Sequence, residues 1–478
     1  MRVCFRRCRC SQSRDKHIDT ILQSNIFRTL KAESNNKSKS RLSLLFPSSL
    51  TTRLTIVYFG VSIGIALQIG AANWDIIWHG ITDVESFFTP PHTVLYSGVA
   101  LTIGSIFIGI IQYVMLGEIN REKEKEHEHQ SQIDKPSELT TTNKSLSSYS
   151  FLTSLHYFFQ SLLKIPYPIK LIAIGTTIEI FSGGFDSWWH YTFGFDGLLS
   201  PPHLLLTIGM LTSVYGALIG IYKLLQNNRH SNNNRNSTLL KISFIVTYAV
   251  AWIVSVNTIF MFSLPYSKGQ YFDFNPNPFA AIFIASISIP FVSAMIFYSA
   301  AKTLRDVRFR FTFITLAFMI IHSTATIISS SHFAILYPLY LLNIIPALIA
   351  DFLIMSKRSQ HNKKEKRSSM TEREQPRIAH HIFKRLGPRL IASELMRNQM
   401  LVVVSSAIVP IFFITLFFPW SVNVYKAFFG IDMNTFESLA IFNLLFWPFI
   451  IPFVITVSVL VSLMGSYTMS RVLSKTLS

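Results

Sequence analysis

The sequence predicts an all-α protein that crosses a membrane about ten times. Half of its 478 residues are hydrophobic and only 14% are charged. Several apolar runs reach the roughly 20 residues that a helix needs to cross the hydrocarbon core of a bilayer. Lys and Arg residues crowd into alternate loops between these runs, as the positive-inside rule predicts. Together these observations indicate a polytopic integral protein of the cell membrane.

The apolar runs set the expected helices, and the basic loops set their orientation. Transmembrane helices are predicted near 53–79, 90–117, 164–192, 201–225, 240–262, 278–302, 308–328, 332–356, 398–420 and 439–468. The basic loops predict that both termini face the cytoplasm. The loops 80–89 and 193–200, which carry no Lys or Arg, are then expected on the extracytoplasmic side.

Polar segments divide the chain into parts. Residues 1–52 are basic and rich in Ser and Asn, which predicts a disordered cytoplasmic tail and not a cleaved signal peptide. Residues 118–163 and 357–396 are dense in charge and predict cytoplasmic linkers. The membrane part then comprises a module at 53–225, a four-helix bundle at 240–356 and a C-terminal helical hairpin at 398–478.

The net charge of +18 raises the question of an acidic partner. Nucleic acid is not expected, because the sequence has no folded basic module with aromatic platforms. The positive charge lies in loops beside apolar helices, where it predicts contact with anionic lipid headgroups. The expected partner is therefore the lipid bilayer.

The module at 53–225 contains an internal repeat. The stretch NWDIIWHGITDVESFFTPPH begins at Asn73, and GFDSWWHYTFGFDGLLSPPH begins at Gly184. An offset of 111 residues aligns the two without a gap, and upstream it also aligns Gly64 with Gly175. The repeat predicts a duplicated helical hairpin, with copies near 53–117 and 164–225 on either side of the 118–163 linker.

Helical geometry brings one acid and two histidines of each copy together. In the first copy, Asp75 and His79 are four residues apart and share one face at the outer end of a helix. Thr89 is a suitable N-cap for the next helix, whose first turn then holds His92. Both helix ends lie at the outer face, so the three side chains reach the same depth. The second copy repeats this arrangement with Asp186, His190, Ser200 and His203.

Two imidazoles and one carboxylate form a good ligand set for a divalent transition metal ion. We therefore predict metal ligands at Asp75, His79, His92, Asp186, His190 and His203. Three further acids are candidates to orient a ligating imidazole through its second ring nitrogen: Glu85, Asp196 and Glu179. Ligand type alone leaves copper, zinc and iron open. The alternative is a membrane scaffold in which the same residues form a hydrogen-bonded staple between helix ends.

The metal motif resembles a known family. The pattern D-x-x-W-H, an acid ten residues after the Asp, and then F-T-P-x-H is similar to the C subunit of copper membrane monooxygenases, which include ammonia and particulate methane monooxygenases. This pattern falls on Asp75, Trp78, His79, Glu85, Phe88, Thr89, Pro90 and His92. The resemblance covers about 60–225 and implies that Asp75, His79 and His92 are copper ligands. The second copy would correspond to a second histidine-containing cluster of that family, which has an amide where Asp186 stands.

The resemblance implies a copper-binding membrane protein near the extracytoplasmic face. It would be an oxidoreductase subunit that acts on a small substrate, with other monooxygenase-type subunits or copies of itself as partners. The ligand set also fits a non-catalytic protein for metal transport, assembly or storage. Helices five to ten have no counterpart in the resemblance, and the sequence identifies no catalytic residue.

Overall fold

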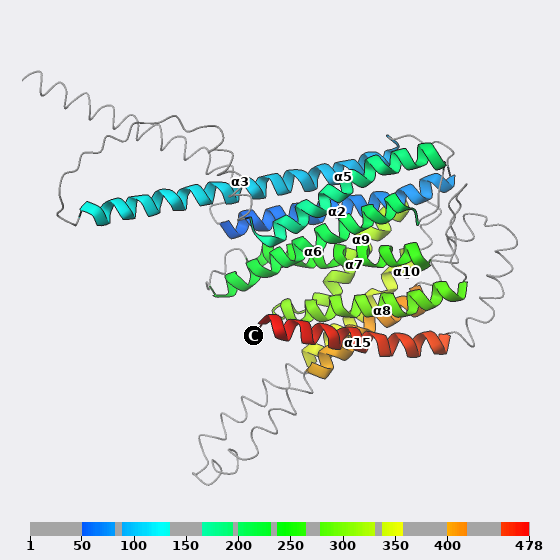
Figure 1. The fold of residues 1–478 in the computed structure, drawn as a ribbon. Helices are drawn as coiled ribbons and strands as arrows, with labels where there is room; N and C mark the ends of the chain where they lie inside the picture. Colours follow the sequence, from blue (N-terminus) through cyan, green and yellow to red (C-terminus); the bar gives the residue numbers. More distant parts are fainter. Residues whose placement is uncertain are drawn as a thin grey trace, which may run out of the picture. The chain divides into compact units, whose positions relative to one another are not determined.

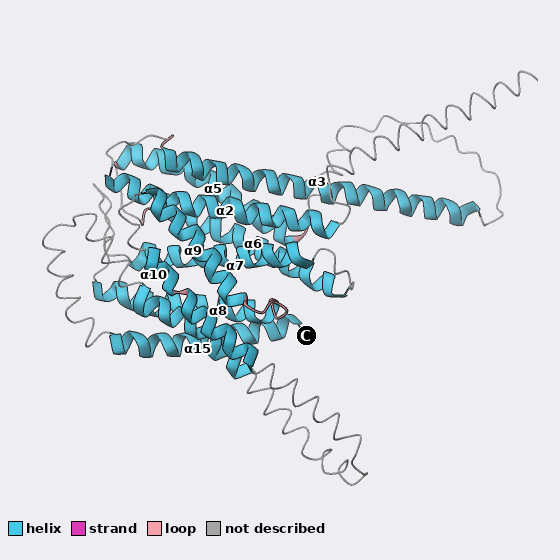
Figure 2. Cartoon of the chain, turned by 180° about the vertical axis from the view of Figure 1, so that it is seen from behind, coloured by secondary structure: helices cyan, strands magenta, loops and turns pink. Residues whose placement is uncertain are grey.

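The computed structural model describes residues 50–81, 88–133, 165–194, 199–230, 237–263, 278–329, 337–356, 399–417 and 451–477. Nearly all of these residues are helical, and no strand occurs among them (Figure 2). The chain divides into two units, Met1–Leu54 and Thr55–Ser478, and the contacts described below lie within the second. The predicted all-α class is confirmed for the described part.

The helices follow the chain in the order shown in Figure 1. They are α2 (Leu50–Ile81), α3 (Pro90–Ile133), α5 (Tyr167–Phe193), α6 (Pro201–His230), α7 (Ser237–Ser263), α8 (Pro278–Thr303), α9 (Arg310–Ser329), α10 (Tyr337–Leu342), the short π-helical turn η3 (Phe413–Phe417) and α15 (Ile451–Leu477). Proline begins α3, α6 and α8, where its fixed φ suits a first helical turn.

Six helices are long and apolar enough to cross a membrane, which supports a membrane-embedded protein. They are Leu50–Trp78, Pro90–Tyr113, Pro201–Asn228, Thr238–Ser263, Phe283–Thr303 and Ile451–Leu473. Shorter apolar helices lie at Arg310–Ala325, Tyr340–Ser356 and Gln399–Thr415. The α5 helix has 27 residues, but Glu179, Asp186 and His190 lower its hydropathy. The other four predicted spans, and the orientation of all ten, stay predictions.

Three boundaries differ from the sequence-based expectation. The α3 helix continues to Ile133 and so enters the predicted 118–163 linker. The stretch REKEKEHEHQ explains this, because Glu, Lys, Arg and Gln are strong helix formers. The predicted helix 332–356 is interrupted by a turn at Asn343. The last helix continues to Leu477, beyond its predicted end at 468, while its predicted start at 439 lies outside the described residues.

The first two hairpins cross through pairs of glycines. A Cβ atom added to Gly64 in α2 would lie 2.7 Å from the carbonyl oxygen of Gly98 in α3. A Cβ atom added to Gly175 in α5 would lie 2.6 Å from the carbonyl oxygen of Gly209 in α6. Only glycine permits backbones to approach this closely. Gly64 and Gly175 are 111 residues apart, and so are Gly98 and Gly209. The two hairpins therefore cross at equivalent residues of the repeat.

Helix α7 joins these hairpins to the rest of the molecule. It packs against α6, α8 and α9, while α8 packs against α15 (Figure 1). From α2, Asn73 accepts a hydrogen bond of 3.2 Å from Asn257 of α7. The core of this region is Trp252, which is fully buried and donates a 2.8 Å hydrogen bond to Ser293. The indole contacts three further aromatic rings, those of Phe297, Phe318 and Phe413.

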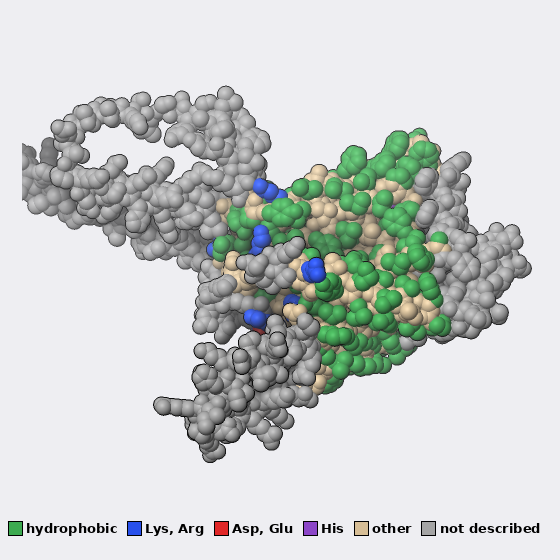
Figure 3. Space-filling view, turned by 60° about the horizontal axis from the view of Figure 1, so that its bottom comes forward, with side chains coloured by type: hydrophobic (Ala, Val, Ile, Leu, Met, Phe, Trp, Pro, Cys, Tyr) green, Lys and Arg blue, Asp and Glu red, His purple; other side chains and the backbone are tan. Residues whose placement is uncertain are grey.

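The surface of the described helices is apolar along their length and basic at one end. Figure 3 shows hydrophobic side chains over most of this face, with Lys and Arg side chains gathered at one end. In α5, Lys170 lies in the first turn, at the opposite end from Asp186 and His190. In α6, Lys223 lies in the second half of the helix, whereas His203 lies in its first turn. The candidate ligands and these cations therefore occupy opposite ends of the same helices.

Candidate metal centre

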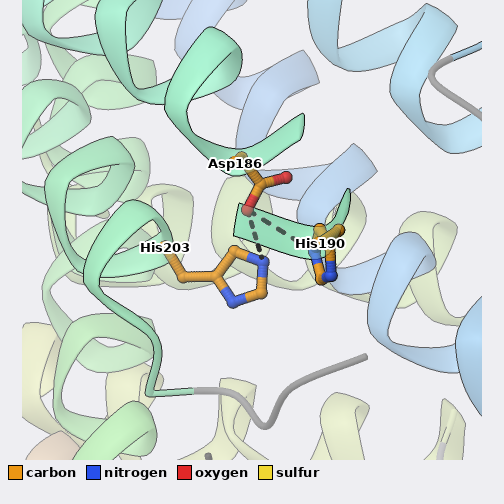
Figure 4. A group of neighbouring side chains, drawn as sticks. All are labelled: Asp186, His190 and His203. Carbon is orange, nitrogen blue, oxygen red and sulfur yellow. Dashed lines mark ion pairs between the residues drawn. The ribbon is translucent and has the colours of Figure 1, made fainter. Parts of the chain in front are cut away.

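The second hairpin brings Asp186, His190 and His203 together (Figure 4). Asp186 and His190 lie near the end of α5, and His203 lies in the first turn of α6. One ligand atom from each side chain can be chosen so that all three lie within 4.8 Å of one another. The convergence predicted from the spacing of the second copy is present in the structure.

Local backbone structure fixes the ends of both helices. Gly194 follows α5 with a φ of 71°, a conformation that favours glycine, and its N–H donates to the His190 carbonyl at 2.9 Å. At the start of α6, the Ser200 hydroxyl accepts a 3.4 Å hydrogen bond from the backbone N–H of His203. In the first copy, the Thr89 hydroxyl accepts from the N–H of His92, also at 3.4 Å. The predicted N-caps are thus confirmed at both helices.

The carboxylate of Asp186 faces both imidazoles. Its Oδ1 atom lies 3.3 Å from His203 Nε2 and 3.6 Å from His190 Nε2. The three side chains are partly exposed, at 22%, 30% and 19% for Asp186, His203 and His190. Asp186 Oδ1 itself is buried, and it accepts no hydrogen bond of ordinary geometry from any described residue.

These distances are compatible with a metal site. Two ligands that each lie about 2.1 Å from a tetrahedral metal ion are about 3.4 Å apart. The separations of 3.3 and 3.6 Å are close to this value, and they are also within the range of direct Asp–His ion pairs. The geometry therefore admits both a bound metal ion and a staple between the helix ends.

The second ring nitrogen of His190 contacts the backbone. Its Nδ1 atom lies 3.2 Å from the carbonyl oxygen of Gly194. A carbonyl oxygen only accepts, so this contact needs a proton on Nδ1. With the proton there, Nε2 is the ring nitrogen that could bind a metal ion. Backbone carbonyls commonly hold metal-binding histidines in this way.

The first hairpin forms an equivalent pair of side chains. His92 Nε2 lies 3.3 Å from Asp75 Oδ2, the same distance that separates His203 from Asp186 in the second hairpin. Both Asp75 and His92 are 16% exposed. The side chain of His79 lies outside the described residues. Two of the three predicted ligands of the first copy are therefore close together in the structure.

Tyr96 is a residue near both sites that the sequence analysis did not select. It lies one turn after His92 on α3, and the centroids of the two rings are 6.0 Å apart. Its hydroxyl is close enough to interact electrostatically with both Asp75 and Asp186. The offset of 111 places Thr207 at the equivalent position of α6. The i,i+4 spacing from His92 is the sequence signal that could have identified Tyr96.

The acids predicted to support the ligands have different outcomes. Glu85 and Asp196 lie outside the described residues. Glu179 lies on α5, buried at 2% exposure, and accepts a 2.9 Å hydrogen bond from the Ser213 hydroxyl. The partner of the second ring nitrogen of His190 is the Gly194 carbonyl and not an acid.

Aromatic side chains surround the end of α5. Phe185 stacks on Trp188 with ring centroids 5.7 Å apart, and Trp189 contacts Phe193 at 4.5 Å. Trp188 and Tyr191 are exposed. Amphipathic rings of this kind are enriched where a membrane meets water. Their position supports a site at a membrane boundary.

The chain matches no family model, no curated protein and no solved structure. The assignment of the site therefore depends on the geometry above and on the pattern of the repeat.

Proposed function

We propose that this chain is an integral membrane protein that binds a transition metal ion through Asp186, His190 and His203. The observation that carries the proposal is the Asp186 Oδ1 atom, which faces two imidazole nitrogens at 3.3 and 3.6 Å without a hydrogen bond from a described residue. A divalent cation at this point would interact favourably with the carboxylate and with both nitrogen lone pairs. The donor set, two imidazoles and one carboxylate, suits copper, zinc or iron.

The first hairpin is proposed as a second site of the same kind. Asp75 and His92 already lie 3.3 Å apart, and His79 would supply the third ligand by the repeat. The resemblance to the C subunit of copper membrane monooxygenases favours copper as the metal. A bound copper ion would supply one-electron chemistry with oxygen to such a site.

A role as an oxidoreductase subunit is the second part of the proposal. Three protein ligands leave coordination positions open, and the ligand side chains are partly exposed, at 19–30%. His190, held by Gly194, and Asp186 would fix the ion, while the exposed side would admit a small substrate. Other subunits of the monooxygenase type, or further copies of this chain, would be partners.

The proposed location is the cell membrane, with the sites near the extracytoplasmic face. Six apolar helices support membrane insertion. Lys170 and Lys223 lie toward the ends of α5 and α6 that are opposite the ligands. By the positive-inside rule, the basic end faces the cytoplasm together with both termini.

Metal analysis tests the binding proposal. Protein in lipid nanodiscs is loaded with Cu²⁺ or Zn²⁺, and the retained metal and its affinity are measured for the wild type, His190→Ala and His203→Ala. Each substitution removes a ligand, so the affinity of the second-hairpin site is expected to fall by more than about 100-fold. Ser187→Ala is the matched control, because Ser187 is exposed on the same turn of α5 and is expected to leave the affinity unchanged.

Wild-type protein that retains no metal would overturn the proposal and leave the scaffold interpretation. Oxygen uptake by the copper-loaded protein with a reductant then tests the oxidoreductase role. Tight copper binding without oxygen uptake would instead favour metal transport, assembly or storage.

A further inference from the structure

The crossing point of the two hairpins contains a buried acid that the metal site does not use. Glu179 of α5 is 2% exposed, and Gln68, its equivalent in the first copy, is fully buried on α2. The two side chains are close enough to interact, so the equivalent positions of both hairpins meet each other. Thr102 and Ser213, also equivalent by the offset of 111, are fully buried and contact Gln68 and Glu179 respectively. We call these four residues the crossing cluster.

The crossing cluster offers Glu179 only two neutral partners, the Ser213 hydroxyl and the Gln68 amide. Ser213 donates to Glu179 Oε1 at 2.9 Å, but Glu179 Oε2 accepts no hydrogen bond from a described residue. Gln68 Oε1 is buried and likewise lacks a donor among the described residues. Two acceptors without a donor, side by side in a buried place, would together be costly.

A second buried acid shows how this chain accommodates a carboxylate that is well supplied with donors. Asp351, fully buried, accepts hydrogen bonds from the backbone N–H groups of Phe311 and Thr312 and from the Thr312 hydroxyl, at 3.3, 2.9 and 2.8 Å. These groups lie at the start of α9, where the helix dipole also favours a negative charge. Glu179 lies in the middle of its helix, where its neighbours are one hydroxyl, that of Ser213, and one amide, that of Gln68.

The described residues around Glu179 supply no compensating charge. The side chains that act on it, Ser213 and Gln68, are both neutral. Two tyrosines on the packed helices face elsewhere: Tyr215 of α6 hydrogen-bonds Ser255 at 3.1 Å, and Tyr96 of α3 faces Asp75 and Asp186. A proton on Oε2 would let this atom donate a hydrogen bond without a neighbouring cation.

We propose that Glu179 binds an exchangeable proton within the membrane and is held there as the neutral acid. The proton lies on Oε2 and is donated to the amide oxygen of Gln68, while Ser213 donates to Oε1. The amide can present either end, since its oxygen and nitrogen exchange places by rotation of the side chain. One proton thus joins the two acceptors that lack a donor, Glu179 Oε2 and Gln68 Oε1, in a single hydrogen bond.

Close packing favours a proton over a metal cation in the crossing cluster. Added Cβ atoms at Gly175 and Gly209 would lie only 2.3 Å from Ser213 Oγ and 2.7 Å from Glu179 Cγ. A hydrated ion does not fit between helices in such contact, whereas a proton needs no additional volume. Glu179 lies two turns inward from Asp186 on α5, about 10 Å along the axis. Delivery of this proton to the metal site would require the proposed function, whereas proton binding by Glu179 does not depend on it.

Infrared difference spectroscopy on metal-free protein in nanodiscs tests the proposal. We expect a carboxylic-acid C=O band at neutral pH that shifts to lower frequency in D₂O and is absent from Glu179→Gln. That variant is expected to fold, because the first copy already has glutamine at the equivalent position, Gln68. If it does not fold, Ser213→Ala serves instead and should move the band, because it removes the donor to Oε1.

Two outcomes would overturn the proposal. A spectrum with only ionised carboxylate at Glu179 would show that the cluster holds a charge. An acid band that remains unshifted after full equilibration in D₂O would show that the proton does not exchange. Because the protein contains no metal in this experiment, neither outcome depends on whether the metal site exists.

Discussion

The two hairpins share their contacts and differ in a few buried side chains. In both, glycines bring the backbones together, a hydroxyl residue caps the second helix, and an Asp–His pair lies 3.3 Å apart. Among the positions that differ are Gln68 against Glu179 and Tyr96 against Thr207. The common contacts define the hairpin and its candidate metal ligands. Gln68 and Glu179 meet where the two hairpins approach each other, so this pair is a place where the two copies offer different chemistry.

The largest effect on folding is expected from the glycine contacts. Gly64→Ala and Gly175→Ala each place a Cβ atom within 2.7 Å of a facing carbonyl oxygen, which cannot move without the helix. Overpacking of this kind costs about 1–3 kcal/mol in the free energy of unfolding. Chemical unfolding in detergent should show similar losses for the two variants, because the two crossings have the same geometry.

Two other glycines are matched controls for this experiment. An added Cβ atom at Gly104 of α3 or at Gly183 of α5 meets no atom within 4 Å. Alanine at these positions is expected to leave the stability unchanged or slightly raised. If Gly64→Ala is harmless while Gly175→Ala is severe, the two crossings are not equivalent and the comparison fails.

A smaller effect is expected from the helix caps. Thr89→Ala and Ser200→Ala each remove a hydroxyl that accepts from the backbone N–H of a candidate ligand residue, at 3.4 Å. The loss should be about 1 kcal/mol for each variant. Thermal unfolding measures it, and Thr192→Ala, at an exposed position of α5, is the control. Equal losses would show that the two hairpins are also equivalent at the starts of their second helices. A loss in only one variant would show that this equivalence does not include the caps.

Local pattern predicted much of the candidate site. The spacing of Asp186 and His190 fixes their common helix face, and the S-P-P-H stretch fixes both the cap and the position of His203. These are short-range properties of an α-helix, so the sequence alone expresses them. The carbonyl of Gly194 as the partner of His190 was not foreseen, although a glycine after a helix is a common termination signal.

Tertiary packing determines the contacts that the local sequence pattern did not predict. Glu179 was expected to support the metal ligands because it shares a helix face with Asp186. The structure places it against Ser213 and Gln68 instead, because the Gly175–Gly209 contact brings α6 close to α5 and because Gln68 of α2 lies on the same side. Membrane spans were predicted from apolar run length, and α5 shows the limit of that criterion, since a functional helix can carry buried polar residues.

The central claim is that Asp186, His190 and His203 bind one metal ion. Pulsed electron paramagnetic resonance on Cu²⁺-loaded protein with ¹⁵N-labelled histidine counts the histidine nitrogens bound to the copper. The Asp75→Ala variant is the background, so that the second hairpin holds the remaining complete site. We predict two coupled histidine nitrogens in that background and one after the further change His203→Ala. Absence of histidine coupling, or an unchanged count after His203→Ala, would contradict the account.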